Sequence, residues 1–537
     1  MDPVPTRVDV LVVGYGPVGA ALAALLGGYG VRTLVVDRAP DVLQMPRAIA
    51  LDNEALRILQ MAGLGEGTFA VRAIPRVRYH SPYAGEFAQV NTAGCLDGHP
   101  RLVTFYQPEL ERALRARVAS LPSVATATGV EMTGFRDTGA AVVVTLRTPD
   151  GGVHEVEAAY LVGADGAASG IRKAIGQDFS GQTYPEEWLI VDAERPNAGF
   201  DEIEFVCDPR RPTPHMPAPG DRERWEFMLH PGEDREAMER PETVRELLAP
   251  YGDVAAMKVE RRAVYRFHAR TCERFLRGRV VLAGDAAHVT PPFVGQGLVA
   301  GLRDAANLAW KLAWIVRGAA SPAVLESYDT ERRPHARAMI DLARFMGHLI
   351  MPRSRLKALL VHGTVRALRL LPWARSWFDD LRIKPENAFR RGLVAPGTPG
   401  AGRWFPQGLL RTGQGELRLA DDVFGARFVL VGAGVDPARH LDAATLGAWT
   451  AAGGATLRLE PRGGARDGDA CEDLTGVMVP GALAVGRVAV LRPDRTIMHT
   501  GSAADAERLV RECLALLAAG GDSPRTATPT RMEPARS

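Results

Sequence analysis

The sequence predicts an α/β protein, α+β overall, with a Rossmann-like nucleotide-binding domain and an inserted, mainly antiparallel domain. Three segments carry the first part of this prediction: residues 14–19 (GYGPVG), 164–166 (ADG) and 283–288 (AGDAAH), each after an apolar run. Ligand sites in open α/β sheets form at the carboxyl ends of strands, so the three segments predict one extended dinucleotide site. Between residues 182 and 268 helical periodicity is largely lost, which predicts the antiparallel insertion.

The first segment has the spacing of a dinucleotide fingerprint. An apolar strand candidate, residues 8–13, precedes Gly14, Gly16 and Gly19, and a helical pattern follows them. In that order, the glycines allow a tight turn, a close approach to a pyrophosphate and close packing of helix on strand. The next apolar strand ends at Asp37, whose carboxylate can accept hydrogen bonds from a ribose. The alternative is a glycine-rich turn in another kind of α/β protein.

A later glycine-rich segment has a different character. Residues 428–431 are apolar and are followed by Gly432 and Gly434, but the sixth position of the fingerprint is Pro437. Proline at that position is poor for close packing of a helix on the strand. We interpret the segment as an ordinary strand and turn, so the sequence predicts a single nucleotide-binding fold.

The other expected elements follow from local patterns of apolar and turn residues. Pro108 suits the first turn of a helix. In chain order the elements are a helix at 53–61, a helix from 108, a hairpin at 141–146 and 153–158, a strand at 279–283, a loop at 291–297, helices to about 371, and alternating strands and helices from about 396.

Composition indicates a globular protein of two to four domains. The chain has 537 residues, and its formal net charge of +2 gives no reason to expect a nucleic-acid or membrane partner. Its five cysteines have no CxxC spacing, which argues against a metal site and favours the cytoplasm. Residues 8–31 lack a basic leader and fit strand, turn and helix better than a targeting segment. Residues 520–537 are expected to form a disordered tail.

Several longer stretches resemble a known family. They are PRAI (46–49), DNEALR (52–57), WLIVD (188–192), CDP (207–209), WEFM (225–228), ERRPHA (331–336) and LRPDR (491–495). With the three segments above, they resemble class A flavoprotein monooxygenases, and within that class the 3-(3-hydroxyphenyl)propionate hydroxylase group. The resemblance covers nearly the whole chain up to about residue 500.

The resemblance implies that FAD is the cofactor. It implies that the fingerprint glycines bind the pyrophosphate, that Asp285 holds the ribityl chain, and that the loop around Pro292 passes the isoalloxazine ring. Asp165 matches a position linked to FAD and NAD(P)H binding. The full implied set is Gly14, Gly16, Pro17, Gly19, Asp37, Arg38, Arg47, Gln107, Asp165, Gly284, Asp285, Pro292, Gly295, Gly297 and Leu298. Helix capping by Asp285, a turn role for Asp165 and a surface role for Arg47 are the alternatives.

The implied domain plan has three domains, a helical linker and a tail. Residues 1–75, 104–181 and 269–335 would form the FAD-binding domain, and residues 76–103 and 182–268 the substrate domain. Residues 336–395 would be a helical linker, and residues 396–519 a thioredoxin-like C-terminal domain. Cys471 is not part of a CxxC motif, so a scaffolding or oligomer-contact role is expected for that domain rather than redox work.

The implied activity is hydroxylation of a phenolic or other electron-rich ring, with NADH or NADPH and O2, through a flavin C4a-hydroperoxide. Hydroxylation of a hydroxypyridine or of a polyketide intermediate in secondary metabolism is the alternative within the class. A flavin-dependent halogenase is disfavoured because its Trp-x-Trp-x-Ile-Pro stretch is absent. A cofactor-less binding module is the alternative from another class. A homo-oligomer is left open.

The sequence does not choose a base for phenol ionisation; Tyr265, His215 and His230 are the candidates. His288 is expected to be a packing histidine, and the arginines of the middle domain are expected to form a solvated face with one possible partner for a substrate carboxylate.

The loop before the long helix departs from the usual Gly-Gln-Gly-x-Asn-x-Gly pattern of the family, because Val299 replaces the asparagine. One interpretation is neutral drift. The other is a less polar floor of the site, for which 3-(3-hydroxyphenyl)propionate would be a poor substrate.

Overall fold

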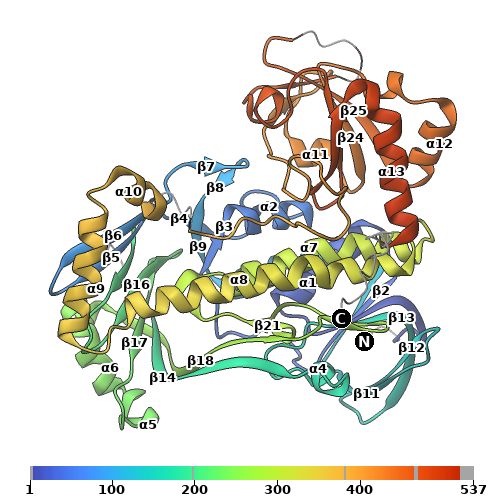
Figure 1. The fold of residues 1–537 in the computed structure, drawn as a ribbon. Helices are drawn as coiled ribbons and strands as arrows, with labels where there is room; N and C mark the ends of the chain where they lie inside the picture. The colour runs from blue at the N-terminus through green and yellow to red at the C-terminus, as the bar shows by residue number, and fades with distance from the viewer. Residues whose placement is uncertain (1–3, 196–198, 380–382, 465–467, 469, 521–537) are drawn as a thin grey trace, which may run out of the picture.

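The computed structural model describes residues 4–195, 199–379, 383–464, 468 and 470–520. Within these residues the strands form three large sheets (Figure 1). The first two sheets lie along the lower part of the molecule in that view, and the third forms a separate body at the upper right. The expected tail, residues 520–537, lies almost wholly outside the described residues.

The first sheet contains the predicted nucleotide-binding strands. Its strand order is β10-β2-β1-β13-β12-β11, with β20 beside β13 and β19 beside β20. The central strands β2, β1, β13 and β20 are parallel, and β1 and β13 are almost wholly buried in their second halves, as the apolar runs predict. The bounds are β1 Arg7–Val13, β2 Thr33–Asp37, β10 Val124–Thr128, β11 Glu131–Asp137, β12 Val142–Arg147, β13 Val153–Gly163, β19 Leu276–Arg277 and β20 Val280–Leu282.

Helices cover this sheet. Helix α1 (Pro17–Gly28) is buried along most of its length and packs against α7 (Gly297–Val316), which is buried along almost its whole length. A buried helix of this kind is stable only in the interior of a large core. The other helices of this part are α2 Asn53–Met61, α3 Gln107–Ala119 and α4 Gly170–Ala174. The predicted helix at residues 53–61 therefore has the predicted bounds.

The second sheet is formed mainly by the predicted antiparallel insertion. Its order is β21-β18-β14-β17-β16-β15-β5-β6, and the two long strands β14 and β18 pair over most of their length. The bounds are β5 Arg76–Ser81, β6 Gly85–Asn91, β14 Phe179–Glu194, β15 Ile203–Val206, β16 Thr213–Ala218, β17 Arg222–Met228, β18 Lys258–Cys272 and β21 His288–Val289. Two short helices, α5 Arg235–Met238 and α6 Pro241–Leu248, also occur in this insertion. A small sheet of β3 Ala50–Asp52, β9 Leu102–Phe105 and β4 Val71–Ala73 lies beside α2, as does the β7–β8 hairpin (Cys95–Leu96 and His99–Pro100).

The third sheet belongs to the C-terminal region. Its order is β23-β22-β26-β25-β24-β27-β28, and α12 and α13 lie on its outer side in Figure 1. The segment that imitates a fingerprint is strand β24 followed by a short 3-10 helix, Pro437–His440, so its interpretation as a strand and turn is confirmed. The bounds are β22 Leu409–Arg411, β23 Leu417–Leu419, α11 Ala420–Phe424, β24 Phe428–Ala433, α12 Ala443–Ala451, β25 Gly454–Glu460, β26 Cys471–Asp473, β27 Arg487–Leu491, β28 Ile497–Ser502 and α13 Ala506–Ala519.

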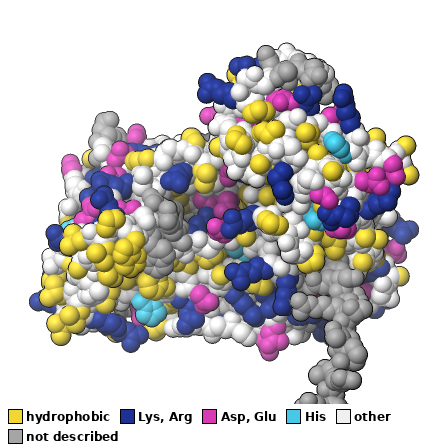
Figure 2. Space-filling view, turned by 45° about the horizontal axis from the view of Figure 1, so that its top comes forward, with side chains coloured by type: hydrophobic (Ala, Val, Ile, Leu, Met, Phe, Trp, Pro, Cys, Tyr) yellow, Lys and Arg dark blue, Asp and Glu magenta, His cyan; other side chains and the backbone are white. Residues whose placement is uncertain are grey.

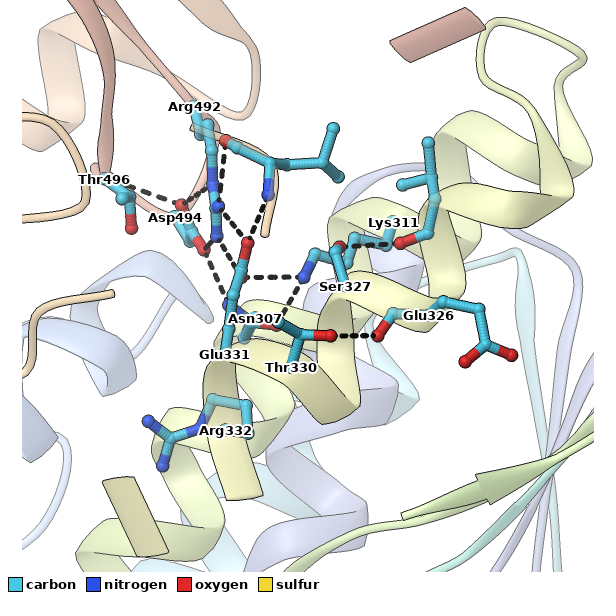
Figure 3. A network of polar contacts seen from close by, with 12 residues as sticks. Asn307, Lys311, Glu326, Ser327, Thr330, Glu331, Arg332, Arg492, Asp494 and Thr496 are labelled. Atoms are coloured by element: carbon cyan, nitrogen blue, oxygen red, sulfur yellow. Dashed lines mark hydrogen bonds and ion pairs between the residues drawn. The ribbon is translucent and has the colours of Figure 1, made fainter. Parts of the chain in front are cut away.

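A buried polar network joins this third body to the helices of the first (Figure 3). Glu331, on α8 (Glu326–Ile350), accepts hydrogen bonds from both Nη atoms of Arg492, at 2.8 and 3.0 Å. The Nζ atom of Lys311 lies 2.8 Å from the same carboxylate, and Asn307 donates to it at 2.7 Å. The side chains of Glu331, Lys311 and Arg492 are fully buried. The C-terminal body is therefore fastened to α7 and α8 through charges that have no access to water.

The helices after α8 present an apolar outer face. Leu356 and Leu360, on α9 (Arg355–Leu368), are 68% and 61% exposed. Leu370, just before α10 (Pro372–Asp379), is 84% exposed, and Trp373, in the first turn of α10, is 69% exposed. Hydrophobic side chains accordingly gather on the left of the molecule in Figure 2. Exposed apolar patches commonly mark protein contacts. The homo-oligomer left open above stays a prediction. In the part of the chain that the structure describes, no helix is long and apolar enough to cross a membrane.

Candidate FAD and substrate site

A cavity of about 360 Å³ lies where the three predicted segments meet. Gly16, Ala164, Gly166, Ala283 and Asp285 line one side of it, so the ends of β1, β13 and β20 converge as the sequence predicts. The wall on the other side comes from strands β14 and β18 of the second sheet. Its residues are Ile190, Arg261, Tyr265 and Phe267.

The fingerprint glycines have three different surroundings. A Cβ atom on Gly14, at φ +104°, would lie 2.2 Å from the carbonyl oxygen of Ala164, and one on Gly19 would lie 1.9 Å from that of Gly14. A Cβ on Gly16 would meet nothing within 4 Å and faces the cavity. Gly14 and Gly19 are therefore required by packing, whereas Gly16 leaves room for a ligand, as a pyrophosphate site needs.

Asp285 lies in a short 3-10 turn, Gly284–Ala286, and lines the cavity. Among the described residues it has no hydrogen-bond partner for its carboxylate, and burial raises its pKa, against the opposing charges of His288 and Arg47. A carboxylate in this condition fits a ligand that supplies hydroxyl donors, such as a ribityl chain. Helix capping by Asp285 is not seen.

Asp304, on α7, holds this turn in place. Its Oδ2 accepts from the Gly284 N–H at 3.0 Å and lies 2.7 Å from His288 Nε2, and its Oδ1 accepts from Arg332 at 2.9 Å. His288 is 1% exposed and lies outside the lining of the cavity, in line with a packing role.

Arg47 and Gln107 both line the cavity. Gln107 Oε1 accepts from the backbone N–H groups of Arg47 and Ala48, each at 2.8 Å, and so fixes the course of this segment. The guanidinium of Arg47 has no partner among the residues that the structure describes, and its side chain is exposed. A surface ion pair of Arg47 is therefore not seen, and its cation is available to an anionic ligand.

Two arginines of the middle domain are buried, which corrects the expectation of a solvated face for them. Arg224 binds Asp192 at 2.6 Å and donates to the carbonyl oxygen of Arg47 at 3.0 Å. Arg261, which lines the cavity, contacts the same Asp192 at 3.1 Å. Opposite charge on Asp192 compensates their burial, and the result is that the second sheet holds the Arg47 segment against the cavity.

The loop before α7 borders the cavity through Pro292, Gly295, Gly297 and Leu298. Gln296 is held from two sides: it donates to Asp52 at 3.1 Å and accepts from Arg303 at 3.0 Å.

Val299 is fully buried in the hydrophobic core around α7 and lines neither this cavity nor the next. The interpretation of Val299 as the floor of the site is therefore wrong, and neutral drift stays as the alternative.

Three predicted positions lie elsewhere. Asp37 accepts from the backbone N–H groups of Tyr15 and Ala39, at 2.6 and 2.8 Å, and Asp165 accepts from those of Gly170 and Ile171, at 2.9 and 3.3 Å. Asp37 thus joins the fingerprint turn to the end of β2, and Asp165 stabilises a local turn through one oxygen, while its buried Oδ1 has no partner among the described residues. The ligand roles of both residues stay predictions. Arg38 lines a separate surface hollow.

A second cavity, of about 350 Å³, adjoins the first. The two share Ile49, Ala50, Pro292 and Gly295 as lining residues, so a ligand in one lies next to a ligand in the other. Most of the lining is apolar, with side chains from β5, β6, β15 and α8. The apolar members include Val77, Tyr79, Phe87, Phe205, Met216, Phe293, Met339, Met346 and Leu349.

Comparison with known proteins identifies the family. The family model described as FAD binding domain matches residues 7–343, and the one described as HcaD C-terminal domain matches residues 402–516. The 3-(3-hydroxy-phenyl)propionate/3-hydroxycinnamic acid hydroxylase 2 of Burkholderia vietnamiensis is 40% identical over 91% of this chain and 93% of its own. The chain belongs to the FAD-dependent aromatic hydroxylases. The expectations of FAD, of the fold class and of a monooxygenase acting on aromatic compounds are thereby confirmed, and a cofactor-less module is excluded.

Other relatives agree. The 3-(3-hydroxy-phenyl)propionate/3-hydroxycinnamic acid hydroxylase of Klebsiella pneumoniae is 35% identical over 91% of each chain. Among solved structures, the OxyS anhydrotetracycline hydroxylase of Streptomyces rimosus superposes with a TM-score of 0.76 at 29% identity, over 96% of this chain and 99% of that one. The flavin-dependent monooxygenase PieE, in complex with FAD and substrate, has a TM-score of 0.80, over 95% and 99% of the chains. At 22% identity this last likeness shows the fold alone.

The first cavity, where the three predicted segments meet, is the candidate FAD cavity. Of the three candidate bases in this hydroxylase, the structure brings only Tyr265 to a cavity, and it is this one. His215 is buried between the rings of Phe200 and Trp225 and lies 2.7 Å from Glu223, outside both cavities. His230 is exposed on a loop. The structure therefore does not support His215 or His230 as the base. His215 is enclosed by aromatic rings, and His230 faces solvent, so neither would reach a substrate in a cavity.

Apart from Tyr265, sequence reasoning missed the wall of this cavity that the second sheet supplies, and it missed Glu226 beside that wall. Glu226 stands opposite Ile190 in the strand register, and burial raises its pKa to about 7. The sequence did offer a signal for Glu226. Side chains alternate along β17, so that Trp225 and Phe227 lie on one face and Arg224 and Glu226 on the other.

The glycine geometry yields a test of the pyrophosphate site. We expect Gly16→Ala to fold normally and to bind FAD at least about tenfold more weakly, because the new methyl group occupies cavity space and displaces no protein atom. Gly19→Ala should instead lower the free energy of unfolding by about 1–3 kcal/mol through overpacking. Flavin titration and thermal unfolding measure the two effects. Equal FAD affinity in Gly16→Ala and wild type would contradict the assignment.

Proposed function

We propose that this hydroxylase adds oxygen to the phenolic ring of a small aromatic substrate held in the second cavity. The observation that carries the proposal is the continuity of the two cavities through Ile49, Ala50, Pro292 and Gly295. A ring at this junction would lie against the isoalloxazine of FAD. The names of the relatives in Burkholderia and Klebsiella, which are hydroxyphenyl-acid hydroxylases, support a phenol.

The size of the second cavity supports a substrate of one or two rings. Its volume of about 350 Å³ is near the lower end of the usual range for ligand pockets, about 300–1,000 Å³. A cavity of this size favours one or two rings over a tetracyclic polyketide. Hydroxylation of a hydroxypyridine remains the second candidate, because its ring has the same size.

We infer the following roles for the chain's own residues. Gly16, Arg47, Gln107 and Asp285 would bind FAD, which when bound supplies the reaction with reducing equivalents from NADH or NADPH and with activated O2. The N-terminus of α7, next to Leu298, would favour negative charge on the reduced ring through its free N–H groups. The apolar lining of the second cavity would exclude water from the reacting atoms. We also infer cytoplasmic operation from the dispersed cysteines.

A substrate screen tests the proposed function. We expect NAD(P)H oxidation to be slow alone and to rise severalfold with a suitable phenol, with a product heavier by one oxygen atom. The panel should contain 3-(3-hydroxyphenyl)propionate, simple phenols, hydroxypyridines and aromatic polyketides, with hydrogen peroxide measured in parallel. Equal oxidation rates with and without every compound, or hydroxylation of polyketides only, would overturn the proposal.

A further inference from the structure

Arg101 is the one charged side chain of the second cavity that the described protein leaves without an opposite charge. It stands between β8 and β9, half-buried, and its backbone N–H donates to the carbonyl oxygen of Gly94 at 3.2 Å. Across the described residues, nothing lies within hydrogen-bond or ion-pair distance of its guanidinium. The neighbouring Leu102 also lines the cavity and begins β9, which pairs with β3 and β4 on its two sides. Arg101 thus directly precedes a strand that is hydrogen-bonded on both sides, which fixes the position of its backbone.

The other charges of the lining are compensated. Lys384 lies 2.8 Å from Asp52 and 3.4 Å from Glu54, and Arg303 contacts both carboxylates from the other side, at 3.0 and 2.6 Å. Burial would raise the pKa of Asp52 and Glu54, but these cations outweigh it and lower both. Glu386 pairs with Arg403 at 3.2 Å. An anion entering the cavity would therefore find one uncompensated cation, Arg101.

We propose that Arg101 binds a carboxylate of the aromatic substrate and is the residue that selects phenolic acids over uncharged phenols of the same shape. The inference rests on the proposed function, because it assigns the second cavity to the substrate. A guanidinium presents a planar fork of donors that matches a carboxylate with two parallel hydrogen bonds, and charge-assisted bonds of this kind are the strong ones. Arg101 is only half-buried, so its guanidinium is open to a ligand that enters the cavity.

FAD is not the partner of Arg101. Arg101 lines the second cavity and not the first, where Arg47 is the available cation. The shared residues at Pro292 and Gly295 mark the end of the second cavity that meets FAD, and Arg101 is not among them. A phenolic acid would therefore place its ring at this junction and its carboxylate at Arg101, which fixes which end of the substrate faces the cofactor.

The test compares a charged and an uncharged ligand of the same shape. 3-(3-Hydroxyphenyl)propionate and 3-(3-hydroxyphenyl)propan-1-ol are titrated into FAD-loaded wild type, Arg101→Gln, Arg101→Lys and Arg353→Gln. Binding is followed by the change in flavin absorption, and hydroxylation by product mass. Arg353 is exposed and lies outside both cavities, so it serves as the matched control. Flavin content and thermal unfolding establish that each variant is folded.

We expect Arg101→Gln to weaken binding of the acid about ten- to a hundredfold and binding of the alcohol less than about threefold. Arg101→Lys should retain part of the affinity for the acid, and Arg353→Gln should match wild type. Equal weakening of both ligands would make Arg101 a wall residue and overturn the proposal. The proposal would also be overturned if the wild-type protein bound the acid no better than the alcohol. Binding of the acid through Arg101 without hydroxylation, when the substrate screen finds another phenol that is hydroxylated, would overturn the assignment to substrate acids and leave the proposed function standing. Failure of every compound in that screen would instead overturn the proposed function.

Discussion

Asp285→Ala should give a folded protein that binds FAD roughly thirtyfold more weakly than wild type. The substitution removes a carboxylate that lines the FAD cavity and has no hydrogen-bond partner in the described protein. Hydrogen bonds to a charged group contribute about 1.5–3 kcal/mol each, and a loss of about 2 kcal/mol corresponds to this change in Kd. Flavin fluorescence during titration of the apoprotein measures it.

The same substitution should leave the FAD-free protein no less stable. Burial raises the pKa of Asp285 in the folded chain above its ordinary value. Between these two pKa values the folded state binds more protons than the unfolded state, so stability falls as pH rises through this range. Ionisation of Asp285 therefore costs stability at neutral pH, and alanine removes the cost. Thermal unfolding of the apoproteins at pH 7 checks the sign.

Two variants control for local damage. Asp285→Asn keeps the shape and the ability to accept a hydrogen bond, and we expect it to bind FAD with intermediate affinity. Asp304→Asn disturbs the turn through the Gly284 N–H and His288 without touching the cavity, so it should lower stability as well as affinity. Full flavin retention in Asp285→Ala would show that Asp285 does not bind the cofactor.

The features predictable from the sequence are those set by residues close together in the chain. Gly14, Gly16 and Gly19 have fixed spacing and act within one turn, so their separate roles can be derived from geometry alone. The same holds for Asp285, which lies in the short turn after a buried strand. Asp37 and Asp165 show the limit of this reasoning, because a short acidic side chain after a strand can serve the neighbouring backbone as well as a ligand.

The features that could not be predicted depend on contacts between distant segments. Arg261 lines the first cavity because β18 pairs with β14, more than sixty residues earlier in the chain, and the pairing register decides which side chains face that cavity. His215 is a plausible base by residue type, but Phe200 and Trp225 enclose it. Arg101 stands between two short strands with no motif, and only the pairing of its neighbours' charges makes it distinctive.

Glu331→Gln should lower the free energy of unfolding by about 3–5 kcal/mol, the largest effect that we expect from a single charge. Glu331 compensates two buried cations, Lys311 on α7 and Arg492 beyond β27, and Figure 3 shows its carboxylate between them. Glutamine keeps the volume of the side chain but removes its negative charge. The two cations then lack one compensating charge at a site that solvent does not reach. Denaturant unfolding of the FAD-loaded protein, followed by flavin release and by circular dichroism, measures the loss.

Glu326→Gln is the matched control, because Glu326 lies on the same helix and pairs with Arg274 at the surface, where both side chains are at least half exposed. Exposed pairs contribute about 0–1 kcal/mol, so this variant should unfold close to wild type. Losses of similar size in the two variants would contradict a special role for the buried network.

The pH dependence of the difference between wild type and Glu331→Gln separates the buried charge from a packing effect. Burial would raise the pKa of Glu331, but Arg492 and Lys311 outweigh it and lower it to about 2. A carboxyl whose folded pKa lies below its unfolded value stabilises the protein at pH values above the unfolded value, about 4.5, and loses that contribution as pH falls toward 2. The contribution of the Glu331 charge to the stability difference should therefore shrink below about pH 4.5. A difference that stays the same down to the acid limit of the fold would show that shape, rather than charge, at position 331 fastens the C-terminal body to α7 and α8.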